Sequence, residues 1–475
     1  MNRSARIIAA ILLAGALGGC SLAPRYQRPA MPAPSPAYKE AGEWKVAAPA
    51  DTAPRGRWWT LFADPQLDAL EDELGGANQN LKAALARLEQ ARAQTRFARA
   101  SWFPTLTAGA SATRGETSVY APTYVAGKPR TGTSYDLGGD LSYEVDLFGR
   151  IRNTVGGARA NEQASAGDLA ALDLALHAEL AGDYFTLRGL DLEQRLLDRT
   201  VADYARALDL TENLYHGGAA AISDVQQAQA QLESARTQAE DTRLRRSQTE
   251  HAIAVLVGQE ASGFSLGPRT EEARWQMPPL AIGVPSQLLE RRPDVAAAER
   301  RVAAANAAIG VARAAYFPVL TLDGTAGWQS LKTSTLLTAP AQYWTVGPQA
   351  LLTVFDAGAH AAQSAQAHAV YDEQVANYRF TVLTAFQDVE DNLAALRQLE
   401  RESVSEAAAV TATQGALQQA NLRYQGGIVT YLEVVSTENA ALAAQLAATD
   451  IEIRRANAAV LLVKALGGDW HPPPP

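Results

Sequence analysis

The side chains that most often carry catalysis or bind metals, cysteine and histidine, are scarce in this chain of 475 residues. Its single cysteine, Cys20, excludes both a disulfide framework and a cluster of cysteine metal ligands. The six histidines show no ligand spacing, and His360 and His368, eight apart on a predicted helix, fit a solvated face. Gly138-Gly139 falls inside a predicted strand and not at a strand-to-helix turn that could bind phosphate. We therefore expect no enzyme, no cofactor and no metal site.

Cys20 is informative because of what precedes it. Two basic residues, Arg3 and Arg6, are followed by an apolar stretch of 13 residues. A membrane-spanning helix needs about 20 such residues, so residues 1–19 are predicted to be a cleaved export signal. The stretch ends in Leu17-Gly18-Gly19-Cys20, which resembles the lipobox of bacterial lipoproteins, in which the cysteine becomes the acylated first residue. The alternative is an ordinary secretory signal with an incidental cysteine.

The residues that follow Cys20 predict where the protein is delivered. In such lipoproteins an Asp directly after the cysteine favours retention in the inner membrane, and this chain has Ser21 there. The resemblance therefore implies delivery to the outer membrane. Residues 20–57 are rich in Pro and Ala and are expected to form an acylated, extended tether. The chain carries 42 Lys and Arg against 51 Asp and Glu, and this acidic balance argues against a nucleic-acid partner.

The rest of the chain repeats itself. Arg99-Ala-Ser-Trp-Phe-Pro104 recurs as Arg313-Ala-Ala-Tyr-Phe-Pro318, shifted by 214 residues. Tyr215-His-Gly-Gly218 recurs as Tyr424-Gln-Gly-Gly427, shifted by 209 residues. Collinear matches of this kind indicate an internal duplication. We expect a first repeat over 58–258, an inter-repeat linker over 259–285, a second repeat over 286–468 and a C-terminal tail over 469–475.

Each repeat is predicted to contain two strands that alternate between apolar and polar residues. The strands are expected over about 104–118 and 133–148 in the first repeat, and over about 318–330 and 343–356 in the second. In the clearest of them, Leu137 and Leu141 alternate with Asp136 and Asp140. A period of two places one face of the sheet in an apolar medium and the other in water. The lengths suit tilted membrane-spanning strands, which need about 9–11 residues, but the edge of a soluble sandwich would show the same alternation.

Helices surround each strand pair. A helix is predicted over 66–100, and long helices are predicted over about 150–216, 222–257, 357–425 and 430–466. Apolar residues three or four apart give these long helices coiled-coil seams, which an inert antiparallel coiled coil would also show. Their many Ala residues allow helices to pack closely on two sides, which favours the wall of a tube.

Closing the predicted sheet requires more than one chain. Known outer-membrane barrels have at least eight strands, and an open sheet edge in lipid leaves backbone groups without partners. Four strands therefore require several chains, most simply in a ring, if they span a membrane. Three chains would supply twelve strands and a wall of twelve helices.

Six motifs, in the right order, resemble the outer-membrane efflux factors, the TolC-like channels of the OprM/NodT lipoprotein type. They are Trp58-Trp59-Thr-Leu-Phe62-Ala-Asp64-Pro65-Gln-Leu67, Asp146-Leu-Phe-Gly-Arg150, Leu289-Glu-Arg-Arg-Pro-Asp-Val295, the stretch from Ala304 to Pro318, Ala385-Phe-Gln-Asp-Val-Glu-Asp391 and Leu466-Gly-Gly-Asp-Trp470. The resemblance covers nearly all of the mature chain. One departure is Ala357-Gly358-Ala359, where the family has an Arg in the last position.

The resemblance implies a mixed fold, mainly α with β, internally duplicated and assembled as a homotrimer. Its twelve-stranded β-barrel would lie in the lipid of the outer membrane and continue into a long periplasmic barrel of twelve helices, with a small equatorial α/β domain. It implies the exit duct of a tripartite efflux system for drugs or other small toxic compounds. The partners would be a periplasmic adaptor and an inner-membrane transporter, expected to be a proton-driven pump of the RND type.

Other functions stay open from the sequence. The same fold could serve type I protein secretion or metal-ion efflux, and a non-channel lipoprotein could use its coiled coils as a periplasmic scaffold. The identity of the neighbouring transporter gene would distinguish protein secretion and metal-ion efflux from drug efflux. Conductance of purified trimers in planar bilayers would distinguish a channel from a scaffold.

The turns between the long helices are expected to form the periplasmic entrance and to contact the adaptor. They contain Gly217, Gly218 and Ser223 in the first repeat and Gly426, Gly427 and Tyr431 in the second. By resemblance the second hairpin is the mobile one, and its Leu432 matches the constricting apolar ring of the family. The family's acidic position is Ser436 here, so Glu433 and Glu438 are expected to form the acidic collar. Alternatively, Leu432 packs in the core of its own hairpin.

Overall fold

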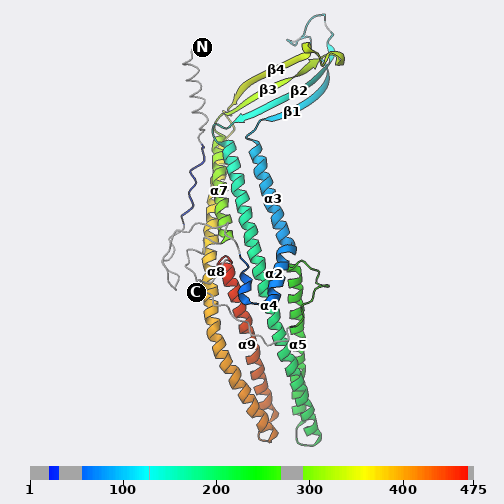
Figure 1. The fold of residues 1–475 in the computed structure, drawn as a ribbon, viewed down its shortest axis with the longest axis vertical. Coiled ribbons are helices and arrows are strands. Elements are labelled where there is room, and N and C mark those ends of the chain that lie inside the picture. Colours follow the sequence, from blue (N-terminus) through cyan, green and yellow to red (C-terminus); the bar gives the residue numbers. More distant parts are fainter. Residues whose placement is uncertain (1–20, 31–55, 123, 128, 269–291, 469–475) are drawn as a thin grey trace. The chain divides into compact units, whose positions relative to one another are not determined.

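A computed structural model describes residues 21–30, 56–268 and 292–468, apart from 123 and 128 (Figure 1). The predicted signal, Cys20, most of the tether, most of the inter-repeat linker and the whole 469–475 tail lie outside the described residues. The chain divides into two units. Unit 1 comprises Met1–Met31, Arg87–Ala166 and Ala297–Arg379, and unit 2 comprises Pro32–Ala86, Gly167–Ala296 and Phe380–Pro475.

Unit 1 contains one antiparallel sheet with the strand order β1-β2-β3-β4 (Figure 1). Its strands are β1 (Thr105–Glu116), β2 (Thr131–Val145), β3 (Val319–Ser330) and β4 (Gln342–Leu351). Two short 3-10 helices, Thr333–Thr335 and Ala339–Ala341, lie between β3 and β4. The sheet therefore joins a strand pair from each half of the sequence through the β2–β3 contact.

The register gives the sheet two unlike faces. One row across all four strands is Thr107, Asp140, Thr325 and Thr345, and the neighbouring row is Leu106, Leu141, Gly324 and Val346. Because adjacent residues of a strand point to opposite faces, these polar and apolar rows lie on opposite faces. The alternation read from the sequence is therefore continuous from strand to strand.

The fourth strand is shorter than the predicted 343–356. It ends at Leu351, which pairs with Val319, the first residue of β3. Pro318 precedes β3, so no residue of β3 remains to pair with 352–355. Asp356 then accepts hydrogen bonds from the backbone nitrogens of Gly358 (2.9 Å) and His360 (2.8 Å), and the following helix begins.

The helices have the following bounds: α2 (Pro65–Ala77), α3 (Gln79–Ala100), α4 (Arg150–His216), α5 (Ile222–Leu256), α7 (Pro293–Ala314), α8 (Ala359–Gln425) and α9 (Tyr431–Ala465), with a 3-10 helix at Trp58–Phe62. Within the described residues, none of the helices combines the length and the apolar composition that crossing a membrane demands.

The single helix predicted over 66–100 is wrong, because Asn78 divides it into α2 and α3. The side-chain oxygen of Asn78 accepts hydrogen bonds from the backbone nitrogens of Asn80 (2.8 Å) and Leu81 (3.0 Å). Such bonds are typical of a helix N-cap and compete with continuation of the preceding helix. The side-chain nitrogen of Asn78 also donates to the carbonyl of Leu256 (2.8 Å), at the end of α5.

The largest core of unit 2 lies where the 3-10 helix and α2 pack against α4, α5 and α9. Its fully buried side chains include Leu67, Leu74, Leu180, Tyr184, Phe185, Ile253 and Val463. Tyr184 donates a hydrogen bond to the carboxylate of Asp64 (2.8 Å), the residue that caps α2. This core holds the middle of α4 and the C-terminal ends of α5 and α9, and the turns between the long helices lie at a distance from it.

Candidate functional site

The two turns between long helices have the same backbone geometry. Gly218 and Gly427 adopt left-handed conformations, with φ of 76° and 71°. Ala219 donates its backbone N–H to the carbonyl of Leu214 (2.8 Å), and Ile428 donates to Arg423 in the same way (2.9 Å). These are Schellman-type helix ends, in which one residue adopts a left-handed conformation. Glycine is favoured there because it has no Cβ to clash with the backbone. Both turns lie at the same end of unit 2 (Figure 1).

Near this end, all four long helices share one small core. Tyr431, Val434 and Val435 of α9 are buried with Ala228 of α5 and Ala420 of α8, and Leu208 of α4 packs against them. The sequence predicts that Tyr431 contacts the adaptor, but its side chain is only 2% exposed and is part of this core. The glycines of both turns and Ser223 are exposed.

Leu432 lies outside this core. Its side chain is 58% exposed, and Ser436, one helical turn further along α9, is exposed as well. Positions four apart share one helix face, so these two residues belong to an uncovered stripe while Val435 faces inward. Among the described residues, Leu432 therefore does not pack in the core of its own hairpin.

The two acidic residues expected in one collar have different surroundings. Glu433 pairs with Arg423 of α8, with 2.7 Å between Oε1 and Nη1. This ion pair bridges the second turn and is about half exposed, so it contributes roughly 0–1 kcal/mol to stability.

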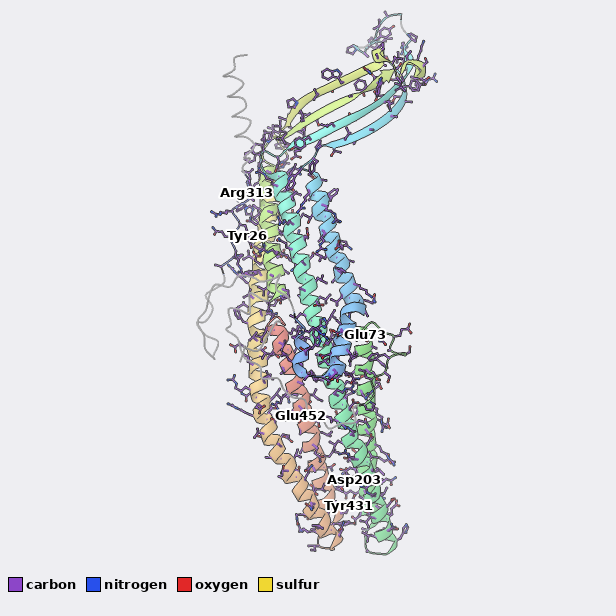
Figure 2. All side chains as sticks on the ribbon, viewed as in Figure 1. Tyr26, Glu73, Asp203, Arg313, Tyr431 and Glu452 are labelled. Atoms are coloured by element: carbon purple, nitrogen blue, oxygen red, sulfur yellow. The ribbon has the colours of Figure 1, made fainter. Side chains whose placement is uncertain are left out.

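Glu438 faces α4 instead. Burial, and then the negative charge of Asp203, raise the pKa of its carboxyl to about 7. Its Oε2 and the hydroxyl of the neighbouring Tyr204 are buried and have no hydrogen-bond partner among the described residues. Figure 2 shows Asp203 and Tyr431 at this end of unit 2. The charge of Glu438 therefore depends on pH near neutrality.

Residues 21–30, the described part of the N-terminal half of the predicted tether, belong to unit 1 and form hydrogen bonds with its helices. Ser21 donates a hydrogen bond to Asn153 (3.0 Å), and Asn306 donates to the carbonyl of Pro24 (2.9 Å). The hydroxyl of Tyr26 donates to the buried carboxylate of Glu299 on α7. Figure 2 labels Tyr26 in this segment and Arg313 of α7, which donates a hydrogen bond to the carbonyl of Leu22 (3.5 Å). The residue next to the predicted lipid site is thus fixed against α4.

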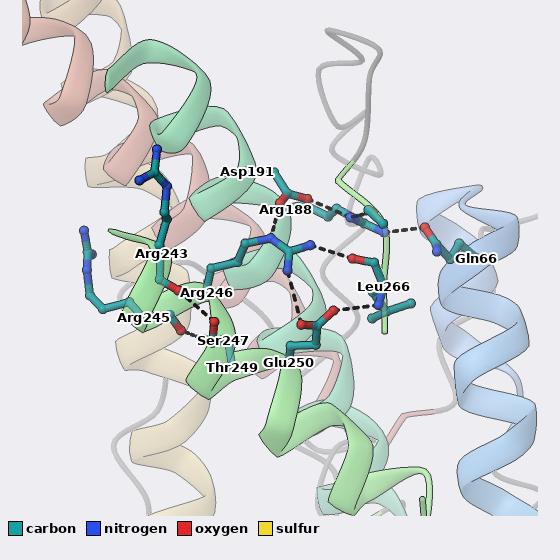
Figure 3. Close-up of polar contacts among 11 residues, drawn as sticks. Gln66, Arg188, Asp191, Arg243, Arg245, Arg246, Ser247, Thr249, Glu250 and Leu266 are labelled. Carbon is teal, nitrogen blue, oxygen red and sulfur yellow. Dashed lines mark hydrogen bonds and ion pairs between the residues drawn. The ribbon is translucent and has the colours of Figure 1, made fainter. Parts of the chain in front are cut away.

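A buried ion network holds the chain after α5 (Figure 3). Asp191 of α4 binds Arg188 and Arg246, each at 2.7 Å, and its side chain is 1% exposed. Arg246 donates to the carbonyl of Leu266 (2.5 Å), and Glu250 accepts from the nitrogen of Leu266 (2.6 Å). Both polar groups of one backbone residue are therefore held by charged side chains of α5.

Sequence reasoning missed Arg423, Asp203 and Tyr204 at the turns. No local pattern distinguishes them, because each acts on a residue of another helix. Among the described residues, no group of three or more His, Cys, Asp and Glu side chains could hold a metal ion.

Comparisons with known proteins agree over nearly the whole chain. The family model described as outer membrane efflux protein matches residues 71–259 and 284–468. The chain is 34% identical to outer membrane protein OprJ of Pseudomonas aeruginosa, over 99% of this chain and 97% of the relative. It is 32% identical to the antibiotic efflux pump outer membrane protein ArpC of Pseudomonas putida, over 96% and 94%. It is 30% identical to the cation efflux system protein CusC of Escherichia coli, over 96% and 97%.

Solved structures show the same fold. A structure of the outer-membrane channel OprN superposes with a TM-score of 0.84 at 32% identity and covers 95% of this chain and 100% of that one. A structure of CusC, described in terms of transmembrane channel formation, has a TM-score of 0.82 at 29% identity and covers 94% and 100%.

Proposed function

The chain belongs to the outer membrane efflux protein family, and we propose that it is the outer-membrane exit channel of a tripartite efflux system. The observation that carries this proposal is the match of both halves of the chain, together with a sheet that is polar on one face and apolar on the other. A sheet of this kind suits a wall between lipid and water. The cargo would be drugs or other small toxic compounds, since ArpC is named for antibiotic efflux.

The working assembly would be a homotrimer. Four strands per chain are too few for a closed barrel, and three copies would give the twelve strands and twelve helices expected for the two barrels. The sheet would lie in the outer membrane, and the long helices would extend into the periplasm. Acylation at Cys20 would add a second attachment next to the bound segment that starts at Ser21.

The channel would depend on partners for energy and direction. A periplasmic adaptor would bind the helix turns around Gly217, Gly218 and Ser223 and around Gly426 and Gly427, whose exposure leaves them accessible. An inner-membrane transporter, of the proton-driven RND type, would supply the cargo. The chain itself would move nothing against a gradient.

The gate would lie on the uncovered stripe of α9. Three copies of Leu432, brought together around the threefold axis, would form an apolar constriction that excludes water and can part without breaking polar bonds. Ser436 would lie one turn further along the same stripe. Glu433 and Glu438 would give the entrance negative charge, the second of them only above about pH 7.

The conductance of a Leu432→Ala variant in planar bilayers tests this gate. Removing the apolar ring should raise the closed-state conductance several-fold and sensitise cells to antibiotics that the outer membrane normally excludes. Ile222→Ala is the matched control, because Ile222 is 51% exposed at the start of α5, in the other hairpin. Unchanged conductance with a lower thermal midpoint would show that Leu432 has a packing role and that the constriction lies elsewhere.

Efflux of metal ions is the second candidate, and the similarity to CusC favours it. Growth of a deletion strain on a panel of transition-metal salts and on a panel of antibiotics would separate the two. Sensitivity to the metals alone would assign the chain to metal efflux.

A further inference from the structure

One row of the sheet in unit 1 contains three glycines and one tyrosine. Gly109 of β1 pairs with Gly138 of β2. Gly138 also pairs with Gly327 of β3, and Gly327 pairs with Tyr343 of β4. Because Asp140 lies two residues from Gly138 on the same strand, this row belongs to the polar face of the sheet. In the four strands as described, Tyr343 is the only aromatic residue on that face.

The side chain of Tyr343 lies flat against the sheet. Its hydroxyl donates a long hydrogen bond to the carboxylate of Asp136 on β2 (3.4 Å). Strands β2 and β4 are separated by β3 and are therefore about 9.6 Å apart, so a side chain standing upright on β4 could not reach Asp136. Tyr343 is half-buried, whereas Thr345 and Gln349 on the same face of β4 are exposed. The sheet itself therefore covers one side of the ring.

Two glycines leave the space that the flat ring occupies. A Cβ at Gly138 would lie 2.7 Å from the hydroxyl oxygen of Tyr343, and a Cβ at Gly327 would lie 3.1 Å from the same oxygen. The first distance is a clash and the second is tighter than most contacts of a Cβ. At Gly109, one strand further along the row, an added Cβ would have nothing within 4 Å. The side chain of Tyr343 thus extends over β3 and reaches β2, but it does not reach β1.

The position of this ring matters for a channel. An aromatic ring laid over a glycine stabilises a sheet in any setting. In the proposed channel, however, the polar face of the sheet lines a water-filled bore. A flat ring at the wall leaves that bore open, whereas a ring standing away from the wall would project into it. In a homotrimer, three copies of Tyr343 would lie at the same level of the bore.

We propose that Tyr343 determines the width of the bore at this level, and that Gly138 and Gly327 are positioning residues that keep its ring against the wall. Asp136 holds the hydroxyl in the flat position. The proposal rests on the proposed channel function and adds a size-determining level inside the barrel, separate from the constriction at Leu432. With the rings flat, bulky solutes pass this level, and with the rings upright they are held back.

Gly138→Ala is the substitution that displaces the ring. The atom nearest to the added Cβ is the end of a rotatable side chain, so the tyrosine can move while the backbone stays in place. Gly327→Ala is unsuitable, because its Cβ would lie 2.5 Å from the carbonyl oxygen of Leu137 in β2. Gly109→Ala is the matched control, because it adds the same methyl group to the same row and face without meeting any other atom.

A cysteine beyond the tyrosine reports the width of the bore. Thr105, four residues before Gly109, lies on the same face and about 14 Å nearer the end of β1 that follows α3. The connection between β1 and β2, at the opposite end, would face the exterior. Membrane-impermeant maleimides that carry polyethylene glycol chains of graded size, added outside intact cells, would pass Tyr343 before they react with Thr105→Cys. The chain without this substitution is the blank, since Cys20 is the expected lipid site.

In the Thr105→Cys background, Gly138→Ala should slow labelling by the largest reagents several-fold and leave labelling by the smallest unchanged. Gly109→Ala should label like the parent, and adding Tyr343→Ala to Gly138→Ala should restore the parent's rate. A purely stabilising role of the ring would not give this restoration.

Two results would overturn the role of Tyr343 while leaving the channel intact. One is equal labelling of the Gly138→Ala and Gly109→Ala proteins by every reagent, and the other is slowed labelling that Tyr343→Ala does not restore. A Thr105→Cys protein that reaches the outer membrane but reacts with no reagent of any size would instead show that the polar face lines no bore open to the exterior. That result would refute the proposed function and the width role with it.

Discussion

The carboxylate of Glu71 lies 2.5 Å from Nδ1 of His177, and this enclosed pair joins α2 to α4. Glu71 is 0% exposed, and the ring of Trp59 stacks on His177 at 4.4 Å. Burial raises the pKa of Glu71 to about 7. Burial alone would lower the pKa of His177, but hydrogen bonds and charge from Asp173 and Glu71 outweigh it and raise the pKa to about 9.

The first prediction is that unit 2 loses stability as the solution becomes alkaline. Both groups bind protons more tightly in the folded protein than in the unfolded chain, where their pKa values are ordinary. The contribution of His177 is complete below about pH 6.5 and is lost as the pH rises through about 9. The thermal midpoint should therefore fall between pH 6.5 and 9.5. In a Glu71→Gln, His177→Gln double variant this fall should be clearly smaller, and an equal fall in both proteins would contradict the assignment.

A second prediction concerns the crossing of α4 and α9. Gly189 lies against Ile453 so closely that a Cβ at 189 would overlap the Cδ1 and Cγ1 of Ile453. Gly189→Ala should therefore destabilise the protein by about 1–3 kcal/mol through overpacking. A further Ile453→Ala substitution should restore part of the loss. Gly415→Ala, with nothing within 4 Å of the added Cβ, is the control and should be neutral or slightly stabilising. Equal effects at 189 and 415 would rule out the close crossing.

A third prediction separates the buried ion network from exposed ion pairs. Asp191→Ala leaves the buried Arg188 and the partly buried Arg246 without their shared partner and should cost about 3–5 kcal/mol of unfolding free energy. The backbone at Leu266, which Arg246 binds, should then become more susceptible to proteolysis. Arg243→Ala removes an exposed pair with Asp198 and should cost at most about 1 kcal/mol. Similar losses in the two variants would show that the network adds nothing beyond surface charge.

A fourth prediction follows from the half-buried carboxyl of Glu438. Because its folded pKa is about 7, the group is charged above that pH and neutral below it. The preference of the open channel for cations over anions should therefore weaken as the pH falls from 8 to 6. Reversal potentials across a salt gradient measure this preference. The change should be absent in Glu438→Gln and retained in Glu433→Gln. Retention of the full change in Glu438→Gln would assign the titration to another group.

What the sequence could predict was local. The helix expected over 150–216 is observed at Arg150–His216, because a run without proline and a glycine pair at its end are signals that neighbouring residues carry. The alternation in Asp136–Leu141 likewise specified which residues share a face. Asn78 shows the limit, because its amide ends one helix by capping the next and by bonding to Leu256, far along the chain.

The rest depended on contacts between distant residues. His177 has no ligand spacing in the sequence, and its partner Glu71 is 106 residues away. Glu433 and Glu438 stand five apart on one helix, yet the first bonds to α8 and the second faces α4. The neighbours of each residue depend on how the long helices pack against one another. The sequence alone therefore grouped Glu433 and Glu438 in one collar and could not show that their surroundings differ.

The central claim is that this chain forms an exit channel through the outer membrane, and single-channel recording in planar bilayers tests it most directly. Purified full-length protein should insert and give discrete conductance steps, small for the wild type and several-fold larger for Leu432→Ala. A folded, lipid-inserted protein that gives no steps in either form would contradict the claim and favour a periplasmic scaffold.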